Sequence, residues 1–114
     1  MAWARIDDGF FCHPKVIRVW DENPGAVGLW VRLISYCSKY ETDGFVTETA
    51  LAMLSPDVSA RSHMVKALIE GAALVAHEDG YVVQGYLDYN PSREQIAQKR
   101  EADRVRKENS RKGK

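Results

Sequence analysis

The sequence predicts an α+β fold: a winged helix-turn-helix domain over residues 1–90, followed by a basic C-terminal arm over residues 91–114 that is helical or disordered. Three observations lead to this prediction. Residues 43–86 follow the order strand, helix, turn, helix, hairpin; a strongly apolar helix precedes them; and Lys and Arg crowd the end of the chain.

Size and composition suit one small domain with a tail. The chain has 114 residues, of which 45% are hydrophobic, enough to fold by burial. No run approaches the roughly 18 apolar residues that span a membrane, and the N-terminus lacks the apolar run of a signal peptide. We therefore expect a cytoplasmic protein of a bacterial host cell, with no membrane partner and with Cys12 and Cys37 reduced and packed.

The formal net charge of zero conceals a split between the two parts of the chain. Residues 1–92 hold seven Lys and Arg against twelve Asp and Glu, a net charge of −5. Residues 93–114 hold nine Lys and Arg against four Asp and Glu, a net charge of +5. The asymmetry predicts an arm that seeks phosphate or an acidic surface, with a merely solubilising tail as the alternative.

The first elements are short. Residues 3–7 alternate apolar and polar side chains, which predicts a strand, and residues 8–9 predict a turn. We expect Phe10 and Phe11 to anchor this segment in the core. Pro14 suits the first position of a helix, because its missing N–H has no partner there. The apolar face of that helix is expected to hold Val16, Ile17 and Trp20.

A second helix begins at Asn23 and Pro24, again a cap followed by a proline. Its side chains are apolar almost all round, which predicts burial on several sides. We expect this helix to form the core against which the helix-turn-helix packs, and residues 41–44 to end it with turn residues.

The helix-turn-helix follows. Thr47 is a good N-cap for a short helix, which residues 55–57 stop because a residue before proline avoids helical geometry. A second helix runs from residue 57 or 59 to about Glu70 and is expected to bury Met64, Val65, Leu68 and Ile69. The Asp79-Gly80 turn between two apolar runs predicts a hairpin.

The arm begins after a break at residues 90–91. Ser92 and Gln95 have the spacing of a capping box. The helix they start carries little apolar surface, and we expect the weak helical pairs Asp103–Lys107 and Glu108–Lys112 along it and fraying over residues 110–114.

Catalytic or metal chemistry finds no support, so we expect no enzyme activity and no cofactor. The three histidines fall on different elements, and no phosphate-binding, metal-binding or nucleophile motif occurs.

Double-stranded DNA is the expected partner. The second helix of the helix-turn-helix is the expected reader of bases, and the alternative is that its polar face is only a solvated surface. Its candidate contacts are Ser59, Arg61, Ser62, His63 and Lys66. The arm's candidate phosphate contacts are Lys99, Arg100, Arg104, Arg106, Lys107, Arg111, Lys112 and Lys114. The acidic hairpin tip at residues 77–80 is not expected to enter a groove.

Six sequence segments carry a family resemblance: residues 2–11, 13–15, 28–30, 36–37, 42–46 and 86–94. They resemble a group of small actinobacteriophage and prophage helix-turn-helix or replication-initiation proteins. That group is similar in plan to the winged-helix front domains of phage replisome organisers. One departure is that the group tends to place a glycine where Ala72 stands. We expect Gly71 to take over as the left-handed helix stop.

Two functions stay open on this basis. The resemblance implies DNA binding at a phage origin or operator, with replication initiation favoured over transcription control. The alternative is a protein-interaction adaptor whose acidic body docks a host or phage replication or transcription component. A homodimer is compatible with either.

Overall fold

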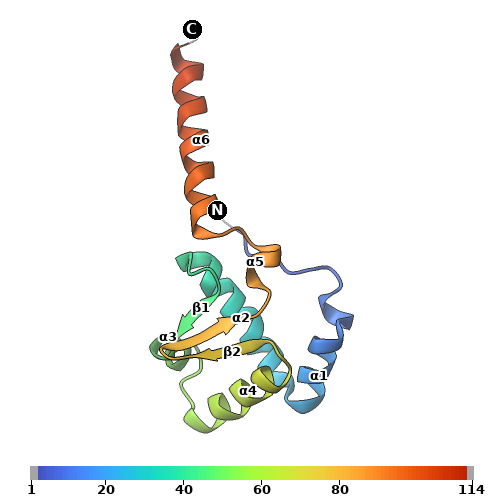
Figure 1. The fold of residues 1–114 in the computed structure, drawn as a ribbon. Helices are drawn as coiled ribbons and strands as arrows, with labels where there is room; N and C mark the ends of the chain where they lie inside the picture. The colour runs from blue at the N-terminus through green and yellow to red at the C-terminus, as the bar shows by residue number, and fades with distance from the viewer. Residues whose placement is uncertain (1–2, 113–114) are drawn as a thin grey trace.

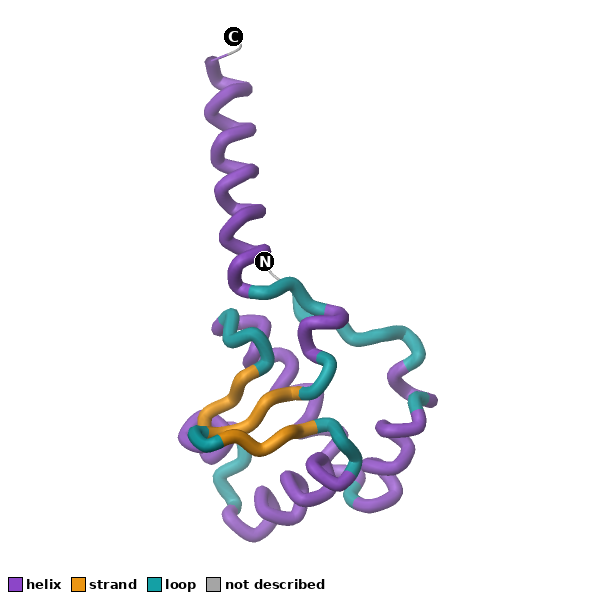
Figure 2. Tube along the Cα trace, viewed as in Figure 1, coloured by secondary structure: helices purple, strands orange, loops and turns teal. Residues whose placement is uncertain are grey.

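The computed structural model describes residues 3–112, and it is an α+β structure in which helices pack against a three-stranded antiparallel sheet (Figures 1 and 2). The elements run in the order η1 (Phe10–Cys12, a 3₁₀ helix), α1 (Pro14–Glu22), α2 (Pro24–Tyr40), β1 (Phe45–Thr47), α3 (Glu48–Leu54), α4 (Val58–Glu70), β2 (Leu74–His77), β3 (Gly80–Val83), α5 (Tyr86–Tyr89) and α6 (Arg93–Lys112). The α+β class predicted from the sequence is confirmed.

The sheet has the order β1-β3-β2, so the second strand of the hairpin lies in the middle. Val82 pairs with Phe45 on one side and with Val75 on the other. His77 pairs with Gly80 across a two-residue turn, which confirms the predicted hairpin. A side chain at Gly80 would collide with the Val46 carbonyl, because β1 passes directly beside it.

Helix α2 is the centre of the core, as predicted. It packs against α1, α3, α4 and β1, and it passes behind the sheet in Figure 1. Its Leu33 and Cys37 are fully buried in the same core cluster as Leu68 of α4 and Val46 of β1. The apolar character of α2 on several sides therefore reflects several packing partners.

The segment before η1 differs from the prediction. Residues 3–7 form no strand; Arg5 is held instead by one buried side chain. The Arg5 N–H donates to Asn90 Oδ1 at 2.7 Å, and Asn90 Nδ2 donates to the Arg5 carbonyl at 3.2 Å. The amide of Asn90 thus satisfies both backbone groups of Arg5, which a partner strand would otherwise do.

Two apolar expectations near the N-terminus are also wrong in part. Phe10 packs edge-on against Trp30 with ring centroids 5.2 Å apart, but Phe11 is 79% exposed. In α1 the buried residues are Val16 and Val19. Ile17 and Trp20, which follow them by one position and so point about 100° away, are 47% and 56% exposed.

The end of α4 corrects a third expectation. Ala72, not Gly71, takes the left-handed conformation, with φ of 60° against −81° for Gly71. Gly71 is needed for a different reason, because a Cβ there would lie 2.5 Å from Cγ2 of Val19. A non-glycine residue in left-handed geometry costs about 1–2 kcal/mol.

We expect Ala72→Gly to raise the free energy of unfolding by about 0.5–1 kcal/mol, since relief of this strain outweighs the extra flexibility of glycine in the unfolded chain. Urea denaturation measures the change. Ala60→Gly, the same substitution inside α4, is the matched control and should lower stability by about 1 kcal/mol. A loss of stability in both variants would contradict the strain at Ala72.

Candidate nucleic-acid interface

Side-chain caps start both α3 and α4, and the cap of α3, Thr47, is the one predicted from the sequence. The Ala50 N–H donates to Thr47 Oγ1 at 3.1 Å, and the Ala60 N–H donates to Asp57 Oδ1 at 2.9 Å. Pro56 lies between the two helices, where it cannot continue α3. Cap and stop signals together therefore fix where the second helix begins.

Two arginines hold the corner between α3 and α4. Arg32 of α2 donates to the Leu54 carbonyl, and Arg61 Nη1 donates to the Ser55 carbonyl at 2.6 Å. These carbonyls lie at the C-terminal end of α3, where backbone oxygens lack intrahelical partners and favour positive charge. The guanidinium groups thus supply partners for the last carbonyls of α3 and tie its end to α2 and α4.

This arrangement corrects the expected position of one candidate DNA contact. We expected Arg61 on the exposed face of α4 with Lys66, but Arg61 is half-buried and bonded into the corner. The two residues are five positions apart, which separates them by about 140° around a helix. Arg61 therefore supports the corner from the side of α4 that faces α3.

The exposed face of α4 consists of the remaining candidates. Ser59, Ser62, His63 and Lys66 are all exposed on this helix, and so is Glu70. His63 and Lys66 also line a surface hollow with Glu22 from the end of α1. Lys66 is accompanied by two carboxylates, so this face carries little positive charge.

The tip of the β2–β3 hairpin is acidic. Residues 77–79 are exposed, and Glu78 and Asp79 occupy the turn itself. Two carboxylates at this position repel a phosphate backbone. The tip adds no attraction for nucleic acid.

The arm is a helix anchored at its root. The Gln95 N–H donates to Ser92 Oγ at 3.1 Å and the Ser92 N–H donates to Gln95 Oε1 at 2.9 Å, which confirms the predicted capping box. The Arg93 N–H donates to Asp43 Oδ1 at 2.6 Å, and Arg100 Nη2 lies 2.6 Å from Glu41 Oε1. The loop between α2 and β1 therefore holds the first turns of α6.

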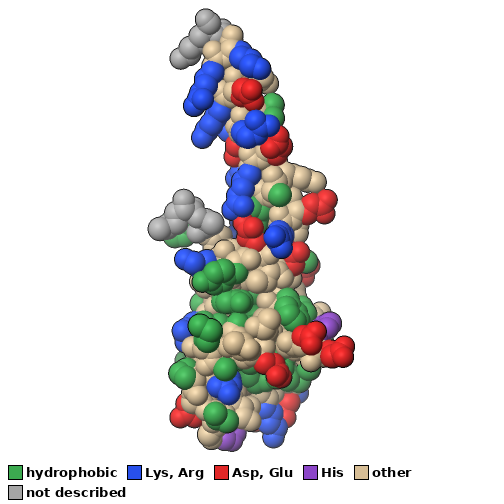
Figure 3. Space-filling model, turned by 90° about the vertical axis from the view of Figure 1, so that its left-hand side faces the viewer, with side chains coloured by type: hydrophobic (Ala, Val, Ile, Leu, Met, Phe, Trp, Pro, Cys, Tyr) green, Lys and Arg blue, Asp and Glu red, His purple; other side chains and the backbone are tan. Residues whose placement is uncertain are grey.

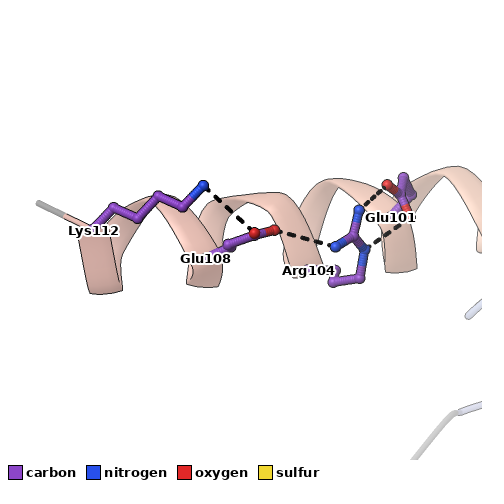
Figure 4. Close-up of polar contacts among 4 residues, drawn as sticks. All are labelled: Glu101, Arg104, Glu108 and Lys112. Carbon is purple, nitrogen blue, oxygen red and sulfur yellow. Dashed lines mark hydrogen bonds and ion pairs between the residues drawn. The ribbon is translucent and has the colours of Figure 1, made fainter.

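Ion pairs run along the rest of the arm (Figure 4). Arg104 binds Glu101 at 2.6 Å and Glu108 at 3.2 Å, and Lys112 binds Glu108 at 3.6 Å. The hydrogen bond from Arg104 holds the pKa of the Glu101 carboxyl below its ordinary value, so this carboxylate stays charged to a lower pH than an isolated glutamate would.

Two details of the arm differ from expectation. Asp103 pairs with Arg106 at 3.0 Å, whereas Lys107 was expected as its partner. The helix continues to Lys112, so residues 110–112 are not frayed, and Lys114 lies outside the described residues. Within residues 3–112, Lys99, Lys107 and Arg111 make no ion pair, which leaves their charge available.

The two sets of candidate contacts are not brought together. Helix α6 leaves the body beside α5, whereas α4 lies at the opposite end of the molecule (Figure 1). The radius of gyration is 17.2 Å, against about 13 Å for a compact domain of similar length. The arm therefore projects clear of the body, and its basic side chains face solvent (Figure 3).

The two cysteines differ in their exposure. Both cysteines are free thiols; Cys37 is buried as expected, but Cys12 is exposed. Burial raises the pKa of the Cys37 thiol, which keeps it protonated and unreactive at neutral pH.

Among residues 3–112 no three His, Cys, Asp or Glu side chains cluster as metal ligands. Over the same residues, no helix combines the length and apolarity required to cross a bilayer.

The sequence patterns did not identify the residues that connect distant segments around these surfaces. Arg32, Glu41, Asp43 and Asn90 all make contacts with residues far along the chain. Residues 41–44 carry only a turn signal in the sequence, which says nothing of a partner 50 positions away.

Comparison of the chain with known proteins gives no relative: no protein-family model, no curated protein and no solved structure matches it.

Proposed function

We propose that this protein is a winged helix-turn-helix protein that binds double-stranded DNA, acting at a phage origin or operator, with replication initiation as its process. The observation that supports the proposal best is the arm: a capped helix with a net positive charge that projects into solvent from a fixed root. Long-range attraction to phosphate needs this kind of exposed cationic surface.

The order β1, α3, α4 and the β2–β3 hairpin supports the winged-helix assignment. In that plan α4 is the helix that reads bases and the hairpin is the wing. The low charge of the α4 face means that this helix selects sequence more than it attracts DNA. Ser59, Ser62 and His63 offer hydrogen bonds for that purpose.

Replacing His63 and Lys66 together by alanine should leave the domain folded, because both side chains are exposed on α4. It should weaken binding by about 1–3 kcal/mol for each base that the helix can no longer bond. Fluorescence anisotropy with duplexes that tile the cognate genome measures this. Lys15→Ala, an exposed change on α1, is the control and should have little effect. Unchanged binding by the double variant would remove α4 as the reader.

A second function, protein-interaction adaptor, is favoured by a separate observation. Phe11, Ile17 and Trp20 line one apolar surface hollow and are all exposed. Apolar clusters on an acidic body are typical of protein contacts. Two experiments distinguish the functions. An adaptor keeps its protein partner after nuclease treatment, whereas a DNA binder shows an affinity for duplex DNA alone that falls steeply with salt.

A further inference from the structure

The helical repeat of α6 sorts the arm's cations into two sets. At about 100° per residue, one set falls within an arc of about 60° and forms what we term the basic stripe. The basic stripe consists of Arg93, Arg100, Arg104, Lys107 and Arg111. Arg104, Lys107 and Arg111 indeed line one surface hollow. The other cations, Lys99, Arg106 and Lys112, lie about 100–140° from the centre of the stripe.

An acidic line runs beside the basic stripe. Glu94, Glu101 and Glu108 are spaced seven residues apart on α6, about 60–100° to one side of the stripe. Glu108 borders the same hollow as Arg104, Lys107 and Arg111. Asp103 lies about 80° to the other side of the stripe, paired with Arg106 at 3.0 Å. The arm is therefore not a uniform polycation, because both flanks of its basic stripe carry carboxylates.

The stripe is also partly ordered in advance of any binding. Glu101 and Glu108 hold Arg104, and Glu41 holds Arg100, at 2.6 to 3.2 Å. The capping box and Asp43 fix the first turn of the helix. The helix and two of the five stripe cations are therefore already ordered, which lowers the ordering cost at the moment of contact.

We propose that α6 lies along a single phosphate strand of B-form DNA, with the basic stripe against the backbone, and does not enter the major groove. A helix inside that groove, about 12 Å wide, has a phosphate strand on each flank. The acidic line would then face one of the two strands, and Asp103 would face the other. With the helix over one strand the acidic line turns to solvent, and Arg100 to Arg111 cover about 16 Å of backbone. This inference rests on the proposed DNA binding.

The test compares two triple variants that remove the same charge. One changes the stripe (Arg104→Gln, Lys107→Gln, Arg111→Gln); the other changes the remaining cations (Lys99→Gln, Arg106→Gln, Lys112→Gln). Anisotropy with a duplex at several salt concentrations should show the slope of log affinity against log salt falling by about 2–3 for the stripe variant and by less than about 1 for the other. Circular dichroism confirms that both arms remain helical.

Chemical footprints locate the helix. Ethylation interference should mark a short line of phosphates on one strand that disappears with the stripe variant, while guanine N7 protection should be the same for parent and variant. Equal slopes for the two variants, or N7 protection that depends on the stripe, would overturn the inference while leaving DNA binding in place. A parent protein that does not bind duplex at about 50 mM salt would overturn both.

Discussion

Removing residues 93–114 is expected to leave duplex binding barely detectable at physiological salt. The remaining body has a net charge of −5 and meets a polyanion unfavourably, while the arm carries nine cations against four anions. Each phosphate neutralised steepens the fall of log affinity with log salt by about 0.9. If about four arm cations reach phosphates, truncation should flatten that slope by roughly 3–4. Anisotropy with one duplex, full-length chain against truncated chain, at several salt concentrations gives both slopes.

The truncated body must be folded for this comparison to hold, and the structure predicts that it is. Helix α6 buries no residue. Truncation breaks the hydrogen bond from the Arg93 N–H to Asp43 and the exposed Arg100–Glu41 pair, and such exposed pairs contribute about 0–1 kcal/mol. The melting temperature should fall by less than about 4 °C. Equal salt slopes for the two chains, with cooperative melting intact, would make the arm a solubilising or protein-docking segment.

Sequence patterns predicted the elements whose causes are local. Thr47 caps α3, Pro24 begins α2, and Ser92 with Gln95 begins α6, each through residues at most three positions apart. The hairpin turn is local in the same sense. Backbone geometry and capping act over one turn of chain, so they can be inferred from neighbouring residues alone.

What sequence patterns could not predict depends on contacts between distant residues. Phe10 and Phe11 are adjacent and chemically identical, and the position of Trp30 determines which of them is covered. The helical periodicity predicts Arg61 as an exposed cation, yet its guanidinium donates a hydrogen bond to the free carbonyl of Ser55. Asp43 reaches the arm 50 positions later. These outcomes follow from packing geometry, which periodicity does not contain.

Leu68→Asp is expected to unfold the domain, whereas Ile69→Asp at the next position should not. The helical pattern predicts both as buried, but Leu68 is 0% exposed and Ile69 is 40% exposed. An unpaired carboxylate at the site of Leu68, in the core with Leu33 and Val46, costs several kcal/mol. That cost is comparable with the whole stability of a small domain, about 5–15 kcal/mol.

The pair of variants controls for everything except burial. Both carboxylates are introduced near the C-terminal end of α4, so the unfavourable interaction with the helix dipole, about 0.3–1 kcal/mol, is nearly the same in each. Thermal melting followed by circular dichroism should show no cooperative transition for Leu68→Asp, but a melting temperature within about 8 °C of the parent for Ile69→Asp. Similar losses of stability in the two variants would mean that α4 is rotated about its axis relative to this structure. The face with Lys66 would then not be the exposed one, and the assignment of α4 as the reading helix would fail with it.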